Sequence, residues 1–221
     1  MMLTLKIRSI LAVFFVAMIS LNTPIWSADR YDIVIENGRV IDPASSTDAL
    51  LNVGIVEGSI AAVTTASLVG KLHIDATEQV VSPGFIDLHS HAQTWMGQKY
   101  QALDGVTTAL ELEAGAYPVA AVGNQIADKA LINFGASAGH FAMRIKVMEE
   151  KDQPYLFFGG NLPDASGPGF KQRASVEQIE MLRRHLNLGL DQGGLGIGLL
   201  LDYMSDAVSH EELEMVFEVA A

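Results

Sequence analysis

Two histidines at the end of a short apolar run are well suited to metal chemistry. His89 and His91 close the segment Val81–His91, in which a Ser-Pro-Gly turn leads into Phe-Ile-Asp-Leu. Side chains alternate along a strand, so the two imidazoles would share one face, about 6–7 Å apart at the backbone and close enough to bind one ion. The same spacing is compatible with two surface histidines on an edge strand.

Two glutamates in the next strand-like segment, Leu103–Glu113, are the acidic candidates. Val106, Thr107 and Thr108 are good strand formers, which places Glu111 and Glu113 on one face. A buried carboxylate is unfavourable without a partner, and we expect that partner to be a metal ion. The pattern leaves open which glutamate is a ligand, while the other pairs with a nearby base or faces solvent.

Strands and helices must bring these side chains together, and the chain alternates between the two. We expect four βα units in residues 83–221, with strands near 85–91, 106–113, 131–140 and 195–203. The expected helices run from Tyr117-Pro118 to about Ala130, from a capping box at Ser175 to Gly189 and the Gly193-Gly194 pair, and onward from Ser209. In an α/β barrel the chemistry lies at the carboxyl ends of the strands, where His91 and Glu113 would stand.

Residues 29–82 predict a small β domain without a cluster of catalytic residue types. Asn37-Gly38 predicts a hairpin within Tyr31–Asp42, and Glu57-Gly58 predicts a second one within Asn52–Val63. His73 lies here alone, and we interpret it as structural or solvent-facing.

Residues 1–28 have the pattern of a secretory signal peptide. Lys6 and Arg8 precede the apolar run Ile10–Leu21, and the small residues Ser27 and Ala28 follow it. We therefore expect an exported protein, in a bacterial periplasm, with no stable membrane association once the signal is cleaved.

Composition excludes several classes of function. The net charge of −12 argues against nucleic acids and anionic membrane surfaces as partners. The sequence has no cysteine, which excludes disulfides, thiolate metal ligands and a cysteine nucleophile.

Several motifs occur in the order found in one enzyme superfamily. Ser82–His91 resembles the first barrel strand of the amidohydrolase superfamily, metal-dependent hydrolases with His-x-His on strand one. Gly105–Thr108 is similar to that family's second strand, and Gly139-His140 followed by Arg144 matches a later motif. The resemblance runs from about Tyr31 to the last residue and points to the branch of the D-aminoacylases (N-acyl-D-amino-acid deacylases). It implies an α/β fold: the first half of a (β/α)8 TIM-type barrel, preceded by part of a small β-sandwich.

The resemblance also implies a zinc site with one or two ions. His89 and His91 match the strand-one ligands of the family. In the D-aminoacylases a cysteine near the end of strand two holds the tight zinc, and the nearest position here is Ala114. We expect Glu113 to take the role of that cysteine, with Glu111 as the alternative ligand.

Two further residues are predicted to contact substrate. His140 ends the third predicted strand, and its alternative role is that of a satisfied structural histidine. Tyr203 ends Gly194–Tyr203, which resembles a Gly-x-Gly-x-Ser-x-Gly-Leu-x-Tyr segment of the deacylases, although Leu199 stands where the family has a small or hydroxyl residue.

The family takes further ligands and its general-base aspartate from strands five, six and eight, which four βα units do not supply. We therefore expect no catalytic residue in this segment, and we expect a carboxyl-terminal half or a complementing chain to complete the site. The reaction implied is deacylation of N-acyl-D-amino acids by zinc-activated water. The alternatives are a dihydroorotase-like hydrolase of cyclic amides and a non-catalytic half-barrel.

Overall fold

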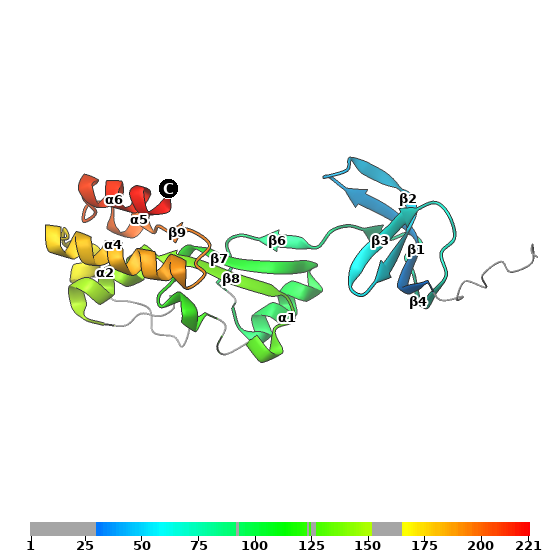
Figure 1. Ribbon diagram of the computed structural model, residues 1–221, viewed down its shortest axis with the longest axis horizontal. Coiled ribbons are helices and arrows are strands. Elements are labelled where there is room, and N and C mark those ends of the chain that lie inside the picture. The colour runs from blue at the N-terminus through cyan, green and yellow to red at the C-terminus, as the bar shows by residue number, and fades with distance from the viewer. Residues whose placement is uncertain (1–29, 92, 123, 125–126, 152–164) are drawn as a thin grey trace, which may run out of the picture. The chain divides into compact units, whose positions relative to one another are not determined.

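The computed structural model describes residues 30–91, 93–122, 124, 127–151 and 165–221. The chain divides after Pro83 into two compact units, which are described separately (Figure 1). The predicted signal peptide lies outside the described residues. Within the residues covered, no helix has both the length and the apolar character needed to cross a membrane.

The first unit is a five-stranded mixed sheet. Its strands are β1 (Tyr31–Asp42), β2 (Thr47–Val56), β3 (Ser59–Thr64), β4 (Gly70–Asp75) and β5 (Val80–Val81). The order is β3-β2-β1-β4, with β5 also paired to β1; β2 is antiparallel to both β1 and β3, whereas β4 and β5 run parallel to β1.

One predicted hairpin is confirmed in this sheet and the other is wrong. Glu57-Gly58 joins the antiparallel strands β2 and β3 as predicted. Asn37-Gly38 does not turn the chain: β1 continues through it, and its register against β2 shifts between Ile35 and Gly38. The Asn37 N–H donates to the Asn52 side chain at 2.9 Å, so the irregular position keeps a partner within the sheet. Asn37 has a φ of 63°, and a positive φ at an asparagine fits this bulge as well as a hairpin, which is why local sequence misled the prediction.

The second unit is a four-stranded parallel sheet with helices, in the order β6-β7-β8-β9. This is the α/β fold expected for part of a barrel. Its strands are β6 (Phe85–Asp87), β7 (Val106–Ala116), β8 (Asn133–Gly139) and β9 (Ile197–Gly198). Its helices are α1 (Trp95–Leu103), α2 (His140–Glu149), α3 (Pro168–Lys171), α4 (Val176–Asp191), α5 (Leu201–Met204) and α6 (His210–Ala220), with 3-10 turns at Val119–Ala121 and Ala127–Lys129.

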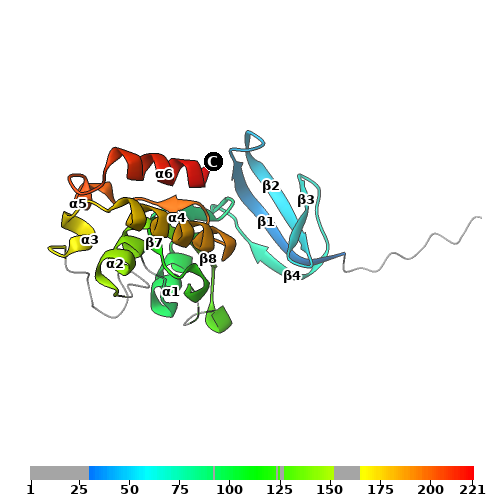
Figure 2. The ribbon, with the colours of Figure 1, turned by 60° about the vertical axis from the view of Figure 1, so that its left-hand side comes forward.

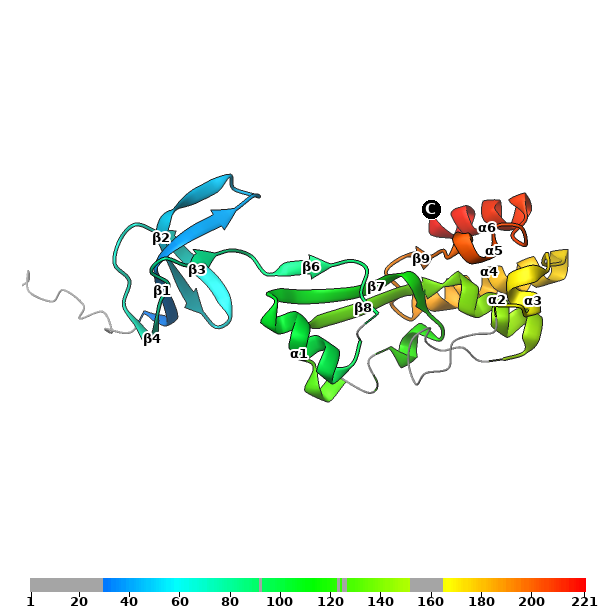
Figure 3. The same cartoon turned by 180° about the vertical axis from the view of Figure 1, so that it is seen from behind.

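The apolar core of this unit lies between the ends of β7 and β8 and the later helices. Helix α2 lies beside α4, and α6 lies along α4 (Figures 2 and 3). Helix α4 begins with the predicted capping box, in which Ser175 accepts from the Gln178 N–H and the Gln178 side chain accepts in return. The large side chains buried here are Phe141, Met143, Phe170, Leu182, Leu186, Met204 and Met215.

Three predicted elements differ from the structure. The helix expected from Tyr117 to Ala130 is wrong: the described part of that stretch holds two short 3-10 turns, in keeping with the weak helix propensity of Gly123 and Asn124. Gly189 lies inside α4 rather than ending it, and a Cβ there would lie 2.8 Å from the Ala138 Cβ, so this glycine allows the helix to pack closely on β8. The fourth strand shrinks from 195–203 to two residues, since Gly196 has a φ of +106° and the chain turns into α5.

Candidate metal centre

Within the described residues, the first strand of the parallel sheet is largely exposed. It pairs with β7 alone, and Phe85 and Ile86 are each 62% exposed. The strand ends at Asp87, and His89 forms an isolated bridge with Glu111. His89 and His91 therefore lie just beyond the carboxyl end of β6, beside the carboxyl half of β7.

His89, His91 and Glu113 converge there. The two Nε2 atoms lie 3.1 Å apart. The Oε2 atom of Glu113 lies 3.0 Å from the His89 Nε2 and 3.3 Å from the His91 Nε2. Among the described residues these three form a group suited to a metal ion. The structure thus brings together the three predicted ligands, while their role as ligands stays a prediction.

The donor set fits a divalent cation. Two imidazole nitrogens and a carboxylate oxygen are a normal zinc set, and ligands about 2.0–2.1 Å from a tetrahedral zinc stand roughly 3.3–3.4 Å apart. A neutral imidazole nitrogen is either a hydrogen-bond donor or an acceptor, and a carboxylate oxygen only accepts. Two Nε2 atoms therefore offer at most two protons for the three contacts within this group, so at least one contact has no hydrogen bond. A cation at the centre of this triangle removes that conflict. The side chains of His89 and Glu113 are 61% and 38% exposed, so solvent reaches the group.

A bulge in β7 aims Glu113 at the histidines. Against β8, Glu111 pairs with Ala136 but Ala116 pairs with Ala138, so the four residues between them oppose Ser137 alone. The Ser137 hydroxyl donates to the Leu112 carbonyl at 2.9 Å. Bulges of this kind redirect side chains at the rims of sheets. Sequence periodicity placed Glu113 on the correct side but gave no sign of the bulge.

Neighbouring glycines make room for the bulge. Gly115 has a φ of +68°, and a Cβ on it would lie 2.6 Å from the Ser137 carbonyl oxygen. A Cβ on Gly198 of β9 would lie 2.6 Å from the Glu113 carbonyl oxygen. The position of Glu113 therefore depends on a residue far away in sequence.

Gly198→Ala is expected to weaken zinc binding because the added methyl group displaces the Glu113 backbone. We expect a loss of affinity of about 10-fold, similar to the loss that follows removal of a group that orients a metal ligand. Isothermal titration with Zn²⁺ measures the effect. Gly135→Ala on β8 is the matched control, since the nearest atom to its new Cβ is the end of the Leu195 side chain. Equal affinities for the two variants would contradict the prediction.

The second glutamate of β7 is fully buried and contacts the outer nitrogen of one histidine. The Oε2 atom of Glu111 lies 2.5 Å from the His91 Nδ1, and its Oε1 accepts from the Ala114 N–H at 3.2 Å. Glu111 is thus the glutamate that pairs with a nearby base, one of the arrangements that the sequence left open.

Backbone and glutamine contacts hold the loop between β6 and α1. The Ser90 N–H donates to the Leu110 carbonyl at 2.9 Å, and Gln101 donates to the Ser90 hydroxyl at 2.7 Å. The buried Gln93 amide donates to the Ala109 carbonyl at 3.0 Å. The segment carrying both histidines is therefore fastened to β7, the strand that carries the glutamates.

His140 lies in a buried polar network of its own. Its Nε2 lies 2.8 Å from the Glu212 carboxylate, and Arg144 also binds that carboxylate through its Nη1. Arg144 further donates to the Gly169 and Gln172 carbonyls at 2.7 and 2.6 Å. His140, Arg144 and Glu212 are all fully buried. The His140 Nδ1 has no hydrogen-bond partner among the described residues, so only one ring nitrogen is satisfied. Substrate contact by His140 and its structural alternative both stay predictions.

Tyr203 differs from its predicted setting, and His185 lies outside the candidate site. Tyr203 lies on helix α5 rather than at a strand end and is 62% exposed, and its contact with substrate stays a prediction. His185 on α4 is half-buried, with its Nδ1 2.5 Å from the Tyr117 hydroxyl. Burial lowers the pKa of His185, and the charge of Lys146 lowers it further.

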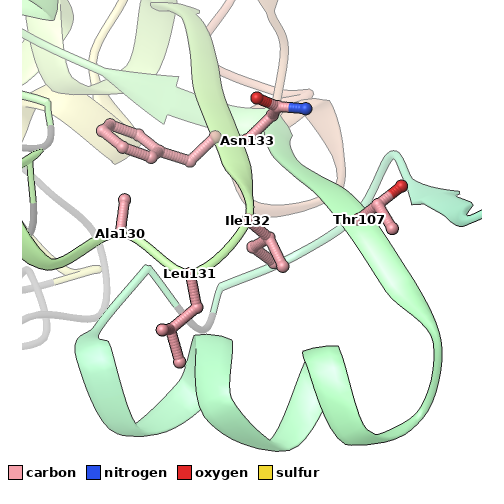
Figure 4. Close-up of a pocket in the computed structure, with 6 residues that line it drawn as sticks. Thr107, Ala130, Leu131, Ile132 and Asn133 are labelled. Carbon is pink, nitrogen blue, oxygen red and sulfur yellow. The ribbon is translucent and has the colours of Figure 1, made fainter. Parts of the chain in front are cut away.

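A shallow hollow of about 560 Å³ lies at the other end of the strands (Figure 4). Thr107 near the start of β7 and residues 130–134 around the start of β8 line it, and none of these side chains is titratable. The amino-terminal ends of barrel strands are associated with stability rather than chemistry, so we assign no site there.

Comparison with known proteins finds relatives over most of the chain, although no family model matches. An N-acyl-D-glutamate deacylase from Alcaligenes xylosoxydans xylosoxydans is 27% identical over 205 residues, covering 87% of this chain and 42% of that protein. A dihydroorotase from Solibacter usitatus is 55% identical over 60 residues, covering 27% of this chain and 14% of that protein. The chain spans less than half the length of these curated relatives.

Solved structures agree on the fold. A crystal structure of a D-aminoacylase has a TM-score of 0.62 at 25% identity and covers 84% of this chain and 42% of its own. An N-acyl-D-glutamate deacylase from Bordetella bronchiseptica, complexed with zinc and a phosphonate mimic of the tetrahedral intermediate, has a TM-score of 0.65 at 21% identity. It covers 87% of this chain and 43% of its own, so the likeness again concerns part of a longer protein.

Proposed function

We propose that this chain, which is related to the amino-terminal part of the D-aminoacylases in the amidohydrolase superfamily, supplies the metal-binding half of a zinc-dependent amidohydrolase. The observation that carries the proposal is the convergence of His89, His91 and Glu113 at the carboxyl ends of β6 and β7. Relatives of this chain are hydrolases of amide bonds, and a structural neighbour holds zinc.

The residues of this chain would bind and orient the reacting groups. His89 and His91 would hold the ion through their Nε2 atoms and Glu113 through its carboxylate, and the negative charge of Glu113 would be balanced there. Bound zinc acidifies water and polarises a carbonyl. Exposure of His89 and Glu113 leaves the group open to a small amide from the solvent side. The general base would come from outside this segment, from a carboxyl-terminal half or a complementing chain.

We propose an N-acyl-D-amino acid as the substrate, cleaved to a carboxylate and an amine. The support is the deacylase relative that aligns with 87% of the chain. The second candidate is a cyclic amide opened by a dihydroorotase-like reaction. The support for this second candidate is the 55% identity to a dihydroorotase, which extends over 60 residues of the chain.

The test uses the native protein that carries this segment, purified with its metal. We expect bound zinc, and release of amine from N-acetyl-D-glutamate at least about 10-fold faster than from the L-enantiomer or than the opening of dihydroorotate. A preference for dihydroorotate would select the second candidate. A zinc-loaded native protein that cleaves none of these compounds would contradict the proposed function and favour the non-catalytic half-barrel.

We also propose that the protein is exported. The support is the basic start at Lys6 and Arg8, followed by the apolar run Ile10–Leu21. Amino-terminal sequencing of the protein from a periplasmic fraction should begin near Asp29. Recovery only in the cytoplasmic fraction, with Met1 retained, would contradict export.

A further inference from the structure

We propose that Glu111 is a positioning residue that fixes the tautomer and ring orientation of His91 for metal binding. The inference rests on the proposed function, since it concerns the same site. The two glutamates of β7 then have different roles: Glu113 binds the metal, and Glu111 binds the Nδ1 of the ligand His91.

The ring of His91 is held between two acidic groups. Its Nε2 faces the His89 Nε2 at 3.1 Å and the Glu113 Oε2 at 3.3 Å. Its Nδ1, on the other side of the ring, lies 2.5 Å from the Glu111 Oε2. An ionised carboxylate only accepts hydrogen bonds, so His91 must carry its proton on Nδ1. In a neutral ring the Nε2 then presents a lone pair to the cluster, as a metal ligand requires.

Glu111 is itself held in place. Its side chain is fully buried, and a buried carboxylate is strongly disfavoured unless its oxygens are bound. The Oε1 atom accepts from the Ala114 N–H at 3.2 Å, and Oε2 is engaged by His91. That amide belongs to the β7 bulge, so the bulge that aims Glu113 also anchors Glu111.

The two histidines differ in how firmly they are held. The His89 side chain is 61% exposed, whereas that of His91 is 30% exposed and lies against Glu111. His91 is therefore the preorganised ligand. We expect zinc affinity to depend strongly on Glu111, although Glu111 does not itself bind the metal. Outer-sphere partners of this kind typically change metal affinity by about 10–100-fold.

The experiment compares this protein with its Glu111→Gln and Glu111→Leu variants by two measurements. The first is zinc affinity by competition with a chelating dye, where both variants are expected to bind about 10–100-fold more weakly. The second is the tautomer of His91 in the metal-free protein, from long-range ¹H–¹⁵N spectra at alkaline pH. The wild type should show the proton on Nδ1, and Glu111→Leu, which offers Nδ1 no acceptor, a shift towards the Nε2-protonated form. Helical circular dichroism must be retained, and Glu111→Gln keeps the side-chain volume so that a folded variant is available.

The outcomes separate this inference from the proposed function. Equal zinc affinity in the wild type and Glu111→Gln, or an unchanged His91 tautomer in Glu111→Leu, would overturn the role of Glu111 and leave the metal site intact. A wild-type protein that binds no zinc would overturn the proposed function and this inference together. Weaker binding with a changed tautomer supports the inference, because a purely structural contribution of Glu111 would not move the proton of His91.

Discussion

Glu113→Ala is expected to lower zinc affinity by more than the roughly 10–100-fold that loss of an outer-sphere partner causes, because it removes a ligand itself. The carboxylate lies within 3.0–3.3 Å of both histidine Nε2 atoms and brings the only negative charge among the three converging groups. Two neutral imidazoles alone would have to hold the ion against its hydration. Zinc content after dialysis, and affinity by titration, measure the loss.

Glu214→Ala is the matched control. Glu214 also pairs with a histidine, because its Oε1 atom lies 3.3 Å from the His210 Nε2. This pair is exposed on α6 and contains one imidazole, whereas Glu113 contacts two. Glu214→Ala should leave zinc binding unchanged. Glu113→Cys should retain much of the affinity, since thiolate is a good zinc ligand, whereas Glu113→Leu should not. Unchanged zinc stoichiometry in Glu113→Ala would remove Glu113 from the site.

The candidate ligands could be predicted from sequence because their placement depends on short-range rules. His89 and His91 are two residues apart, as are Glu111 and Glu113, and strand alternation puts each pair on one side. The division of labour between the glutamates could not be predicted. It depends on the pairing of β7 with β8 and on close contacts at Gly115 and Gly198, and no local pattern specifies these.

The distinction between short-range rules and long-range contacts also explains which other features of the fold could be predicted. The capping box at Ser175 and the Glu57-Gly58 turn involve neighbouring residues, and both occur as predicted. The link from Arg144 to Glu212 spans 68 residues, and the sequence offered only the helix-start pattern at Ser209. Glu212 does lie in that first turn and its N–H donates to the Ser209 hydroxyl, but its side chain goes to the buried network.

Arg144→Met is expected to destabilise the second unit by about 3–5 kcal/mol, the usual effect of removing one partner of a buried ion pair. Arg144 is fully buried and binds the Glu212 carboxylate as well as the Gly169 and Gln172 carbonyls. Methionine fills similar space but leaves those acceptors without their donor. Urea unfolding followed at 222 nm reports on this unit, because the α-helices of the described chain all belong to it.

Arg183→Met is the matched control, since Arg183 also binds a glutamate of α6, Glu218, at 2.7 Å, but at the surface. An exposed pair contributes about 0–1 kcal/mol, so this variant should remain close to the wild type. Adding Glu212→Gln to Arg144→Met should recover part of the loss, because the unpaired buried charge is then removed while an acceptor for His140 remains. Equal destabilisation by Arg144→Met and Arg183→Met would contradict the role assigned to the buried network.

The pH dependence of stability gives an independent measure of the same network. Burial alone would raise the pKa of Glu212, but hydrogen bonds from His140 and Arg144 outweigh it and hold the pKa below its ordinary value. A carboxyl group whose pKa is lowered in the folded state stabilises above its unfolded pKa of about 4.3, and that stabilisation is lost as the pH falls through the folded pKa. Without Arg144 the folded pKa of Glu212 rises towards its unfolded value, so Arg144→Met, already less stable at neutral pH, should lose less free energy of unfolding than the wild type as the pH falls through this range. If the free energy of unfolding falls with pH by the same amount in the two proteins, Arg144 does not stabilise the charge on Glu212.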